Sequence, residues 1–206
     1  MNPRPKRDRR AQFKTELLRK GIHLLIAVTP AIADIDRPLT IILLCAGSVI
    51  YLTGEICRLR GRSIPLLTRV TAFASRPREA GKFVLGPLTL ALGAILSLLI
   101  FPAITADSRA CHAAIYALAF GDGLSGLIGR PFGRLRPAFL LGKSVEGSII
   151  CFIAVFISTC AVTSQTRASL ITALASTIAE ALPLRNMDNI VIPLTAGFTV
   201  MLCYTA

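Results

Sequence analysis

Charged residues and tryptophan are scarce in this sequence. Only 17% of the 206 positions are charged, there is no Trp, and 53% are hydrophobic. This apolar content is too high and too continuous for a soluble domain of this length, so we expect membrane-spanning segments. The few charges are unequal in sign: 23 Lys and Arg stand against 11 Asp and Glu, which gives a net charge of +12.

Close pairs of cysteines are also absent. None of the six cysteines forms a Cys-x-x-Cys pair, and most of them lie within apolar runs. Zinc sites and disulfide frameworks require clustered spacing, so the pattern argues against both. We expect free, buried thiols that pack as small apolar residues.

Seven apolar runs are candidates for membrane-spanning helices, which need roughly 20 residues each. Pro183 is expected to end the sixth and shortest run, because proline cannot continue the helical hydrogen bonding. The runs cover residues 17–35, 39–57, 83–104, 110–128, 145–162, 168–182 and 190–204. The sequence predicts an all-α, polytopic membrane bundle of about seven helices, with a basic cytoplasmic tail at 1–16 and one transmembrane catalytic domain at 17–206.

The basic residues predict the orientation of this bundle. With the N-terminus in the cytoplasm, all 23 Lys and Arg except Arg37, Arg109 and Arg167 fall on the cytoplasmic side. Such a bias follows the positive-inside rule and places the C-terminus outside. The net charge is then explained by topology and by attraction to anionic lipid headgroups, and we expect no nucleic acid partner.

An acid, Asp122, lies inside the fourth apolar run between Gly121 and Gly123. A carboxylate within a span costs about 2.5 to 3.5 kcal/mol on insertion scales and needs a cation, a metal or a proton as partner. A Lys or Arg from a neighbouring helix is one such partner, and metal or proton chemistry is the interpretation that we favour. The two glycines permit close approach of a ligand or of another helix, and Arg130 follows about two turns later.

A second polar group, Lys143, Ser144 and Glu146, opens the fifth run. Ser144 is placed to cap the helix, whose free amides and dipole favour a bound anion, and Lys143 adds a positive charge. Gly142, Lys143 and Ser144 do not make a P-loop, because that pattern requires an earlier glycine and a preceding strand. The sequence predicts an anion site at this helix start.

Two further acids bracket the turn before the last run. Glu180 precedes the turn, and Asp188 with Asn189 follows it. Asp188 is either a plain helix cap or a metal ligand, and one role does not exclude the other. Both acids are expected at the cytoplasmic level of Asp122.

Cations near the same level add to the candidate site. Lys20 and His23 share one face of the first helix with Glu16, because the three are spaced by four and three residues. This face presents a cation and a proton acceptor at the level of the acids. Arg78 and Lys82, in the second cytoplasmic loop, are candidate phosphate ligands.

An ordered set of short motifs resembles the integral-membrane phytol kinase, dolichol kinase and CTP-dependent diacylglycerol kinase family. The matching pieces are 19–23, 55–59, 78–79 with 86–87, 121–123 with Gly129 and Gly133, 143–147, and Glu180 with 188–189 and Pro193. The middle portion is also similar to phosphatidate cytidylyltransferases, but their long C-terminal signature with paired His-Gly-Gly and Asp-Arg residues is absent here. This departure favours the kinase side.

The resulting hypothesis is transfer of the γ-phosphoryl group of a nucleoside triphosphate, CTP or ATP, to the hydroxyl of a membrane lipid at the cytoplasmic face. Such transfer requires Mg²⁺ on carboxylates and cations on the phosphates. The expected metal ligands are Asp122 and Asp188 with Glu146 or Glu180, and a carboxylate or His23 accepts the lipid proton. The expected nucleotide-binding residues are Arg78, Lys82, Gly121, Gly123, Arg130, Lys143, Ser144 and Asn189.

Two alternatives stay open at this stage. Cytidylyl transfer to phosphatidate would use the same cations and metal, and a small ion-coupled transporter would use Asp122 and Glu180 as a relay. The lipid bilayer, a lipid substrate and a nucleotide are the expected partners, in the cytoplasmic (inner) membrane. The sequence leaves open the lipid, the choice between CTP and ATP, and whether the protein forms a homo-oligomer.

Overall fold

Helices make up the fold in this computed structural model, which describes residues 9–61, 81–140, 142–183 and 187–205. The described residues form seven helical segments when each pair joined by a short 3₁₀ or π turn is taken as one. The all-α prediction is therefore confirmed. Arg78 and most of the loop between the second and third expected helices lie outside the described residues.

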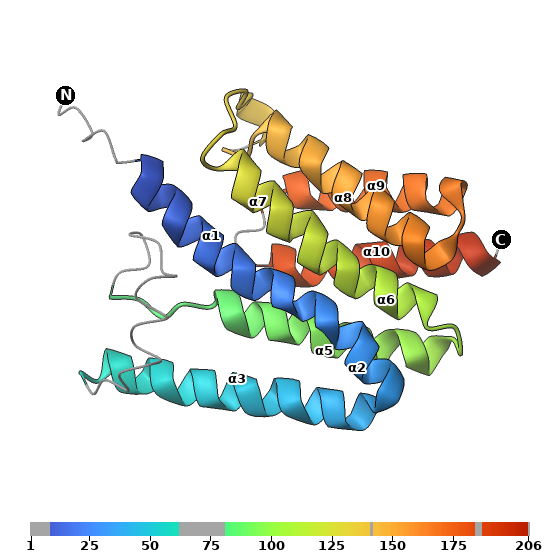
Figure 1. The fold of residues 1–206 in the computed structure, drawn as a ribbon, viewed down its shortest axis with the longest axis horizontal. Coiled ribbons are helices and arrows are strands. Elements are labelled where there is room, and N and C mark those ends of the chain that lie inside the picture. Colours follow the sequence, from blue (N-terminus) through green and yellow to red (C-terminus); the bar gives the residue numbers. More distant parts are fainter. Residues whose placement is uncertain (1–8, 62–80, 141, 184–186, 206) are drawn as a thin grey trace.

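The first half of the chain supplies three segments (Figure 1). Helix α1 (Arg9–Leu25) continues through a 3₁₀ turn, η1 (Ile26–Val28), into α2 (Thr29–Ile35). Helix α3 (Arg37–Leu59) then runs back along the edge of the bundle, and α5 (Gly86–Ile104) packs against it. Asp36 caps α3 through its carboxylate, which accepts a hydrogen bond from the Leu39 amide at 2.8 Å.

The second half supplies four segments. Helix α6 (Arg109–Tyr116), the π-helical turn η3 (Ala117–Asp122) and α7 (Gly123–Gly129) form one continuous rod. A short 3₁₀ turn, η4 (Ala138–Leu140), lies in the following loop. Helices α8 (Val145–Thr163) and α9 (Thr166–Ala181) form an antiparallel hairpin, and α10 (Asp188–Thr205) returns beside them. Helix α9 ends before Pro183, as expected.

The rod from α6 to α7 is the centre of the bundle. Its residues Ala113, Ala114, Ala117 and Ala119 are fully buried, because α5, α8 and α10 pack around it. Small side chains allow helix backbones in a membrane to approach closely, which replaces the hydrophobic drive available in water. The same device brings α5 to α10, where a side chain on Gly93 would collide with the Asn189 carbonyl.

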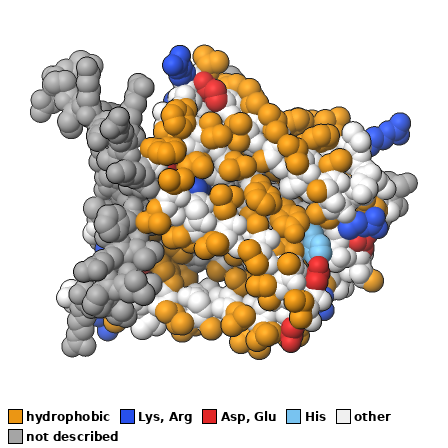
Figure 2. Space-filling model, viewed as in Figure 1, with side chains coloured by type: hydrophobic (Ala, Val, Ile, Leu, Met, Phe, Trp, Pro, Cys, Tyr) orange, Lys and Arg blue, Asp and Glu red, His pale blue; other side chains and the backbone are white. Residues whose placement is uncertain are grey.

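Among the described residues, four helices are long and apolar enough to cross a membrane: α3, α5, the α6 to α7 rod and α8. Apolar side chains cover most of the face seen in Figure 2 between the two ends of the bundle. Leu39, Ile42 and Val49 of α3 are examples of large apolar side chains that stand exposed. Lipid is the environment in which such a surface is stable, and the chain is a multi-pass membrane protein.

The N-terminal helix begins earlier than expected, at Arg9 instead of Leu17. Residues 9–16 are therefore helical in this structure, and residues 1–8 of the expected basic tail lie outside the described residues. Two contacts stabilise this early part of α1. The Phe13 ring packs edge-on against the Phe132 ring with 5.7 Å between the ring centroids, and Glu16 forms an ion pair with Arg130. The six thiols are free, but only Cys111 and Cys151 are buried.

Candidate functional site

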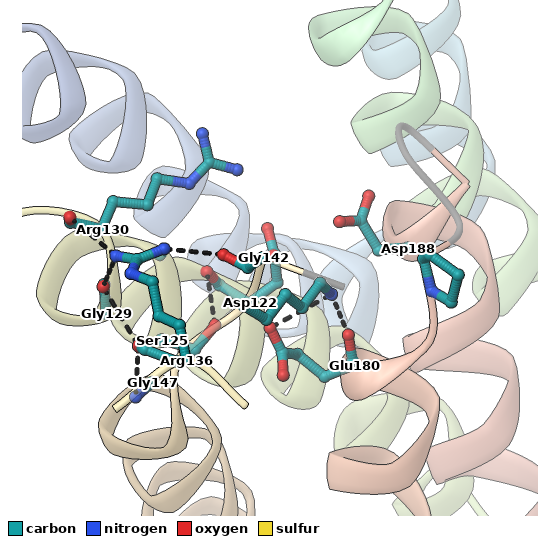
Figure 3. A pocket seen from close by; sticks show the side chains of 13 residues that line it. Asp122, Ser125, Gly129, Arg130, Arg136, Gly142, Gly147, Glu180 and Asp188 are labelled. Carbon is teal, nitrogen blue, oxygen red and sulfur yellow. Dashed lines mark hydrogen bonds and ion pairs between the residues drawn. The ribbon is translucent and has the colours of Figure 1, made fainter. Parts of the chain in front are cut away.

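A polar pocket of about 520 Å³ lies at the end of the bundle where α7 and α9 finish and α8 and α10 begin (Figure 3). It collects six residues that the sequence singled out, and these come from the π-helical turn η3, the end of the rod after α7, the loop before α8, and helices α9 and α10. They are Asp122, Arg130, Lys143, Ser144, Glu180 and Asp188. The described lining is completed by Ser125, Gly126, Gly129, Arg136, Gly142, Gly147 and Pro183. Three carboxylates and three cations thus face one cavity.

Asp122, at the end of the π-helical turn, lies in the pocket wall with its charge balanced from α1. Its Oδ2 atom accepts a hydrogen bond from the Lys20 Nζ at 2.6 Å and lies 3.2 Å from the His23 Nε2. Both α1 side chains are buried, Lys20 to 1% exposure. The sequence argument identified this face of α1 but not its partner, and Asp122 has a lysine partner from a neighbouring helix.

The loop between α7 and α8 is folded tightly around Ser144. The Ser144 hydroxyl donates to the Gly129 carbonyl at 3.0 Å and accepts from the Gly147 amide at 3.2 Å, so it caps α8 as expected. Glycine is required at Gly129 and Gly133, because a Cβ at either position would collide with Ser144. The N-terminal end of α8 is thereby fixed against the C-terminal end of α7.

Arg136 is a pocket residue that the sequence argument counted only toward topology. Its guanidinium donates to the carbonyls of Gly129 at 2.7 Å, Arg130 at 3.1 Å and Gly142 at 2.6 Å. It therefore bonds carbonyls at the end of α7 and in the loop before α8 and ties both sides of the loop together. Only a planar group with several donors can do this. No spacing in the sequence signals the role.

Two further ion pairs link the cavity to neighbouring helices. Lys143 lies 3.2 Å from a carboxylate oxygen of Glu180 and also donates to the Glu180 carbonyl, so it ties the start of α8 to the end of α9. Ser148 donates to the other Glu180 oxygen at 3.3 Å. Arg130 pairs with Glu16 of α1 at 3.0 Å and keeps 41% of its side chain exposed. Arg130 and Lys143 are thus cations with one partner each and an open side toward the cavity.

Asp188 differs from the other two carboxylates of the pocket. Its Oδ1 atom accepts a long, local hydrogen bond from the Asn189 amide at 3.2 Å, and no described residue forms an ion pair with it. Figure 3 shows its carboxylate directed into the open space beside α10, with no interaction drawn to the other lining side chains. Among the described carboxylates of the pocket, Asp188 is the one that forms no ion pair with a described Lys, Arg or His.

Several expected site residues lie outside the pocket. The Glu146 carboxylate accepts from the amides of Arg134 at 2.8 Å and Leu135 at 3.1 Å, so it supports the loop. Lys82 is exposed and does not line the cavity, and His23 lies behind Asp122. Asn189 joins α10 to α5 through the Gly86 carbonyl and the Thr89 hydroxyl.

The glycines beside Asp122 serve helix packing. A Cβ on Gly121 would lie 2.8 Å from Val155 of α8, and one on Gly123 would lie 3.2 Å from Leu24 of α1. Side chains of neighbouring helices therefore fill the space beside both glycines, and neither glycine lines the cavity. Gly126, one turn after Asp122, does line it, and the four-residue spacing from Asp122 could have identified it.

The described residues contain no group of three His, Cys, Asp or Glu side chains that could hold a metal ion alone. Mg²⁺ does not require such a cage, since it is commonly held by one or two carboxylates together with substrate phosphates. The donor set fits that mode: Asp188 lines the cavity without an ion pair to a described residue, and Glu180 lines the same cavity.

Comparison with known proteins adds no name to this geometry. No protein-family model, no curated protein and no solved structure matches the chain.

Proposed function

We propose that this protein is a lipid-alcohol kinase, which transfers the γ-phosphoryl group of a nucleoside triphosphate to the hydroxyl of a membrane lipid. The observation that carries the proposal is the cavity at one end of a membrane bundle, where Asp122, Glu180 and Asp188 face Arg130, Arg136 and Lys143. Phosphoryl transfer depends on positioning and charge neutralisation, and these are the groups that it requires. The motif resemblance to the membrane lipid kinases supports the same conclusion.

The topology belongs to the proposal. All seven helical segments cross or enter the membrane, with the N-terminus in the cytoplasm and the pocket at the cytoplasmic face of the inner membrane. The positive-inside bias supports this orientation, and nucleotide is available on that side. A lipid in the same leaflet reaches the pocket sideways with its hydroxyl at the level of the headgroups.

The residues divide into two groups around the substrates. Arg130, Arg136 and Lys143 bind the polyphosphate, beside the N-terminal end of α8, where the helix dipole also favours an anion. Asp188 and Glu180 are the carboxylates that would hold Mg²⁺ together with the phosphates. The chemistry that Mg²⁺ would supply there is neutralisation of the charge that develops on the transferred group.

The acceptor proton passes to a carboxylate of the cavity. Asp122, Glu180 and Asp188 all line it, whereas His23 lies behind Asp122. A base must come within hydrogen-bonding reach of the proton that it removes. The pocket carboxylates therefore replace His23 as candidates. Glu146 and Asn189 act by holding the α8 loop and α10 in place.

The decisive experiment uses purified protein in lipid nanodiscs with labelled nucleotide and three acceptors: a polyprenol, phytol and diacylglycerol. We expect γ-label from CTP, or from ATP, to enter one of the lipid alcohols in a Mg²⁺-dependent reaction. Phosphatidate is included as a fourth acceptor with α-labelled CTP. Incorporation of the α-label identifies a cytidylyltransferase and overturns the kinase proposal.

One observation favours a transporter as the second candidate. The hydroxyls of Thr159, Thr172 and Ser176 are fully buried and have no hydrogen-bond partner among the described residues. They lie one turn from two bonded pairs that join α8 to α9, Thr163 with Ser169 and Ser148 with Glu180. These polar residues continue from Glu180 toward the far end of the bundle, as a relay across the membrane requires. A transporter shows no nucleotide-induced rise in unfolding temperature, whereas a kinase does.

A further inference from the structure

Helix α1 lines no part of the cavity among the described residues, yet its inner face is polar and buried. Glu16, Lys20 and His23 are 8%, 1% and 5% exposed. A buried lysine is stable only when it is paired and hydrogen-bonded. The Lys20 ammonium meets this requirement twice, through the Asp122 carboxylate at 2.6 Å and the Asp122 main-chain carbonyl at 2.7 Å.

The π-helical turn η3 makes these contacts available. A π turn interrupts the regular bonding of an α-helix, and such turns are frequent at functional sites. Here the carbonyl of Leu118 lies 3.0 Å from the His23 Nε2, and the carbonyl of Asp122 accepts from Lys20. Both carbonyls belong to the turn, at its second and its last residue. The side chains of α1 therefore bond the irregular backbone of the π-helical turn.

Gly126 allows the lysine to reach this position. A Cβ at Gly126 would collide with the Lys20 Cε and lie 2.8 Å from its Nζ. The lysine side chain therefore crosses the surface of α7 at Gly126, where no side chain obstructs it. Asp122 is on the other side of the contact and faces the cavity.

We propose that Lys20 and His23 are positioning residues, which hold Asp122 and the π-helical turn in the pocket wall from outside the cavity. The functional site then includes α1 although no α1 side chain lines the pocket among the described residues. The Lys20 ammonium bonds both the carboxylate and the main-chain carbonyl of Asp122. The direction of that carboxylate and the path of the π-helical turn are therefore set together. This inference rests on the proposed function for its activity measurement, and on the geometry alone for its stability measurement.

The first measurement is a stability cycle in nanodiscs with Lys20→Met, Asp122→Asn and the double variant. Each single substitution leaves one buried charge without its partner, whereas the double substitution removes both charges. We expect both single variants to unfold at lower temperature than the wild type, and the double variant to unfold at higher temperature than either single variant. Additive losses would show that the pair is not coupled and would overturn the inference.

The second measurement is the kinetics of the same variants. A small misplacement of a catalytic group can lower a rate by about 100-fold, so we expect kcat of Lys20→Met and Asp122→Asn to fall by about that factor. The KM for nucleotide should stay within about threefold, because the phosphates are bound by other cations. The double variant should be no slower than the slower single variant. Multiplying losses, or wild-type kcat in Lys20→Met, would contradict a positioning role.

Gly126→Ala provides a test that leaves every charge in place. Its new methyl group displaces the Lys20 side chain, so we expect kcat to fall while the KM for nucleotide is retained. Gly21→Ala is the matched control: it lies on α1 itself, and its Cβ would meet no atom within 4 Å. Equal kcat values for the two variants would contradict the inference.

The two proposals fail in different ways. If the wild-type protein phosphorylates no lipid alcohol, the proposed function is wrong, and the stability cycle still decides whether Lys20 and Asp122 act as a unit. If the wild type is active and the cycle is additive, the kinase proposal stands without the role for α1.

Discussion

The two ends of the bundle both carry ion pairs, but the pairs are built differently. At the pocket end, Lys20 pairs with Asp122 at a separation of 102 residues, and Arg130 pairs with Glu16 at a separation of 114. The side chains are buried, except for that of Arg130. At the opposite end, Arg109 pairs with Asp107 two residues away, in a partly exposed position. His112 contacts an Asp34 side chain that is 56% exposed.

The difference separates a built site from ordinary surface electrostatics. Exposed pairs contribute about 1 kcal/mol or less. Buried charges are expensive to remove from lipid headgroups and water and are kept only with good partners. A chain that buries several charges at one end and leaves them exposed at the other has concentrated its polar function at the first end. Four predictions test this contrast.

The largest effect is expected at the carboxylate without an ion pair. Asp188→Asn should lower phosphoryl transfer by about 100-fold or more, because it removes a charge needed at the metal and phosphates. The unfolding temperature should change little, since no described cation depends on Asp188. Asp34→Asn, at the other end, is the control and should retain full activity. Near-wild-type transfer by Asp188→Asn would remove Asp188 from the site.

The next effect concerns one cation from each end. Lys143→Met should raise the KM for nucleotide by about 10-fold, because a charge facing the phosphates is lost. Arg109→Met breaks an ion pair and a contact over the Tyr204 ring at 4.0 Å, and it should leave this KM unchanged. Steady-state kinetics over a nucleotide series distinguishes them. A shared KM effect would mean that the substitution acts through global structure.

Two helix caps give a closer comparison. Ser144→Ala and Asp36→Ala each remove a side chain that bonds the first turn of a helix, and each should lower the free energy of unfolding by about 1 kcal/mol. Only Ser144→Ala should also weaken nucleotide binding, by a few-fold, because its cap shapes the pocket. Thermal unfolding with and without nucleotide measures both quantities. Weakened binding in Asp36→Ala would show that the ends are coupled.

The smallest effect is a pH dependence outside the membrane. The side-chain hydrogen bond from Arg109 lowers the pKa of Asp107 below its ordinary value. This pair therefore contributes stability above the unfolded pKa of about 4, and the contribution is lost as the pH falls through the lower folded value. The difference in unfolding temperature between wild type and Asp107→Asn should be small at neutral pH and vanish in acid. A difference that grows in acid would have the wrong sign.

Most of the secondary structure was predictable because apolar runs and helix-ending residues are local signals. Six of the seven expected runs match helices within three residues at each end. The first run did not reveal that the helix begins at Arg9, since its early turns are polar. Those turns are stabilised by Phe132 and Arg130, more than 110 residues away, and no local pattern contains that information.

The candidate site was predictable in its composition but not in its pairing. Spacing placed Asp122, Lys143, Glu180 and Asp188 at one membrane level, and the structure brings them to one cavity. Spacing could not show that Lys20 would form an ion pair with Asp122, or that the Glu146 carboxylate would accept hydrogen bonds from amides of the loop before α8. These outcomes depend on side-chain direction within one turn of helix. The roles of all of them in catalysis stay predictions.

The separation of Lys20 and Asp122 has a consequence for biosynthesis. At roughly 5 to 20 residues per second, a ribosome needs about 5 to 20 s to make the intervening 102 residues. During that time the lysine has no carboxylate partner, so we expect α1 to wait at the membrane surface and to dock only after α7 is inserted. A cysteine placed at Leu24, which lies against Gly123 of α7, should react with a water-soluble thiol reagent in nascent chains that end before Asp122. It should become protected in longer chains.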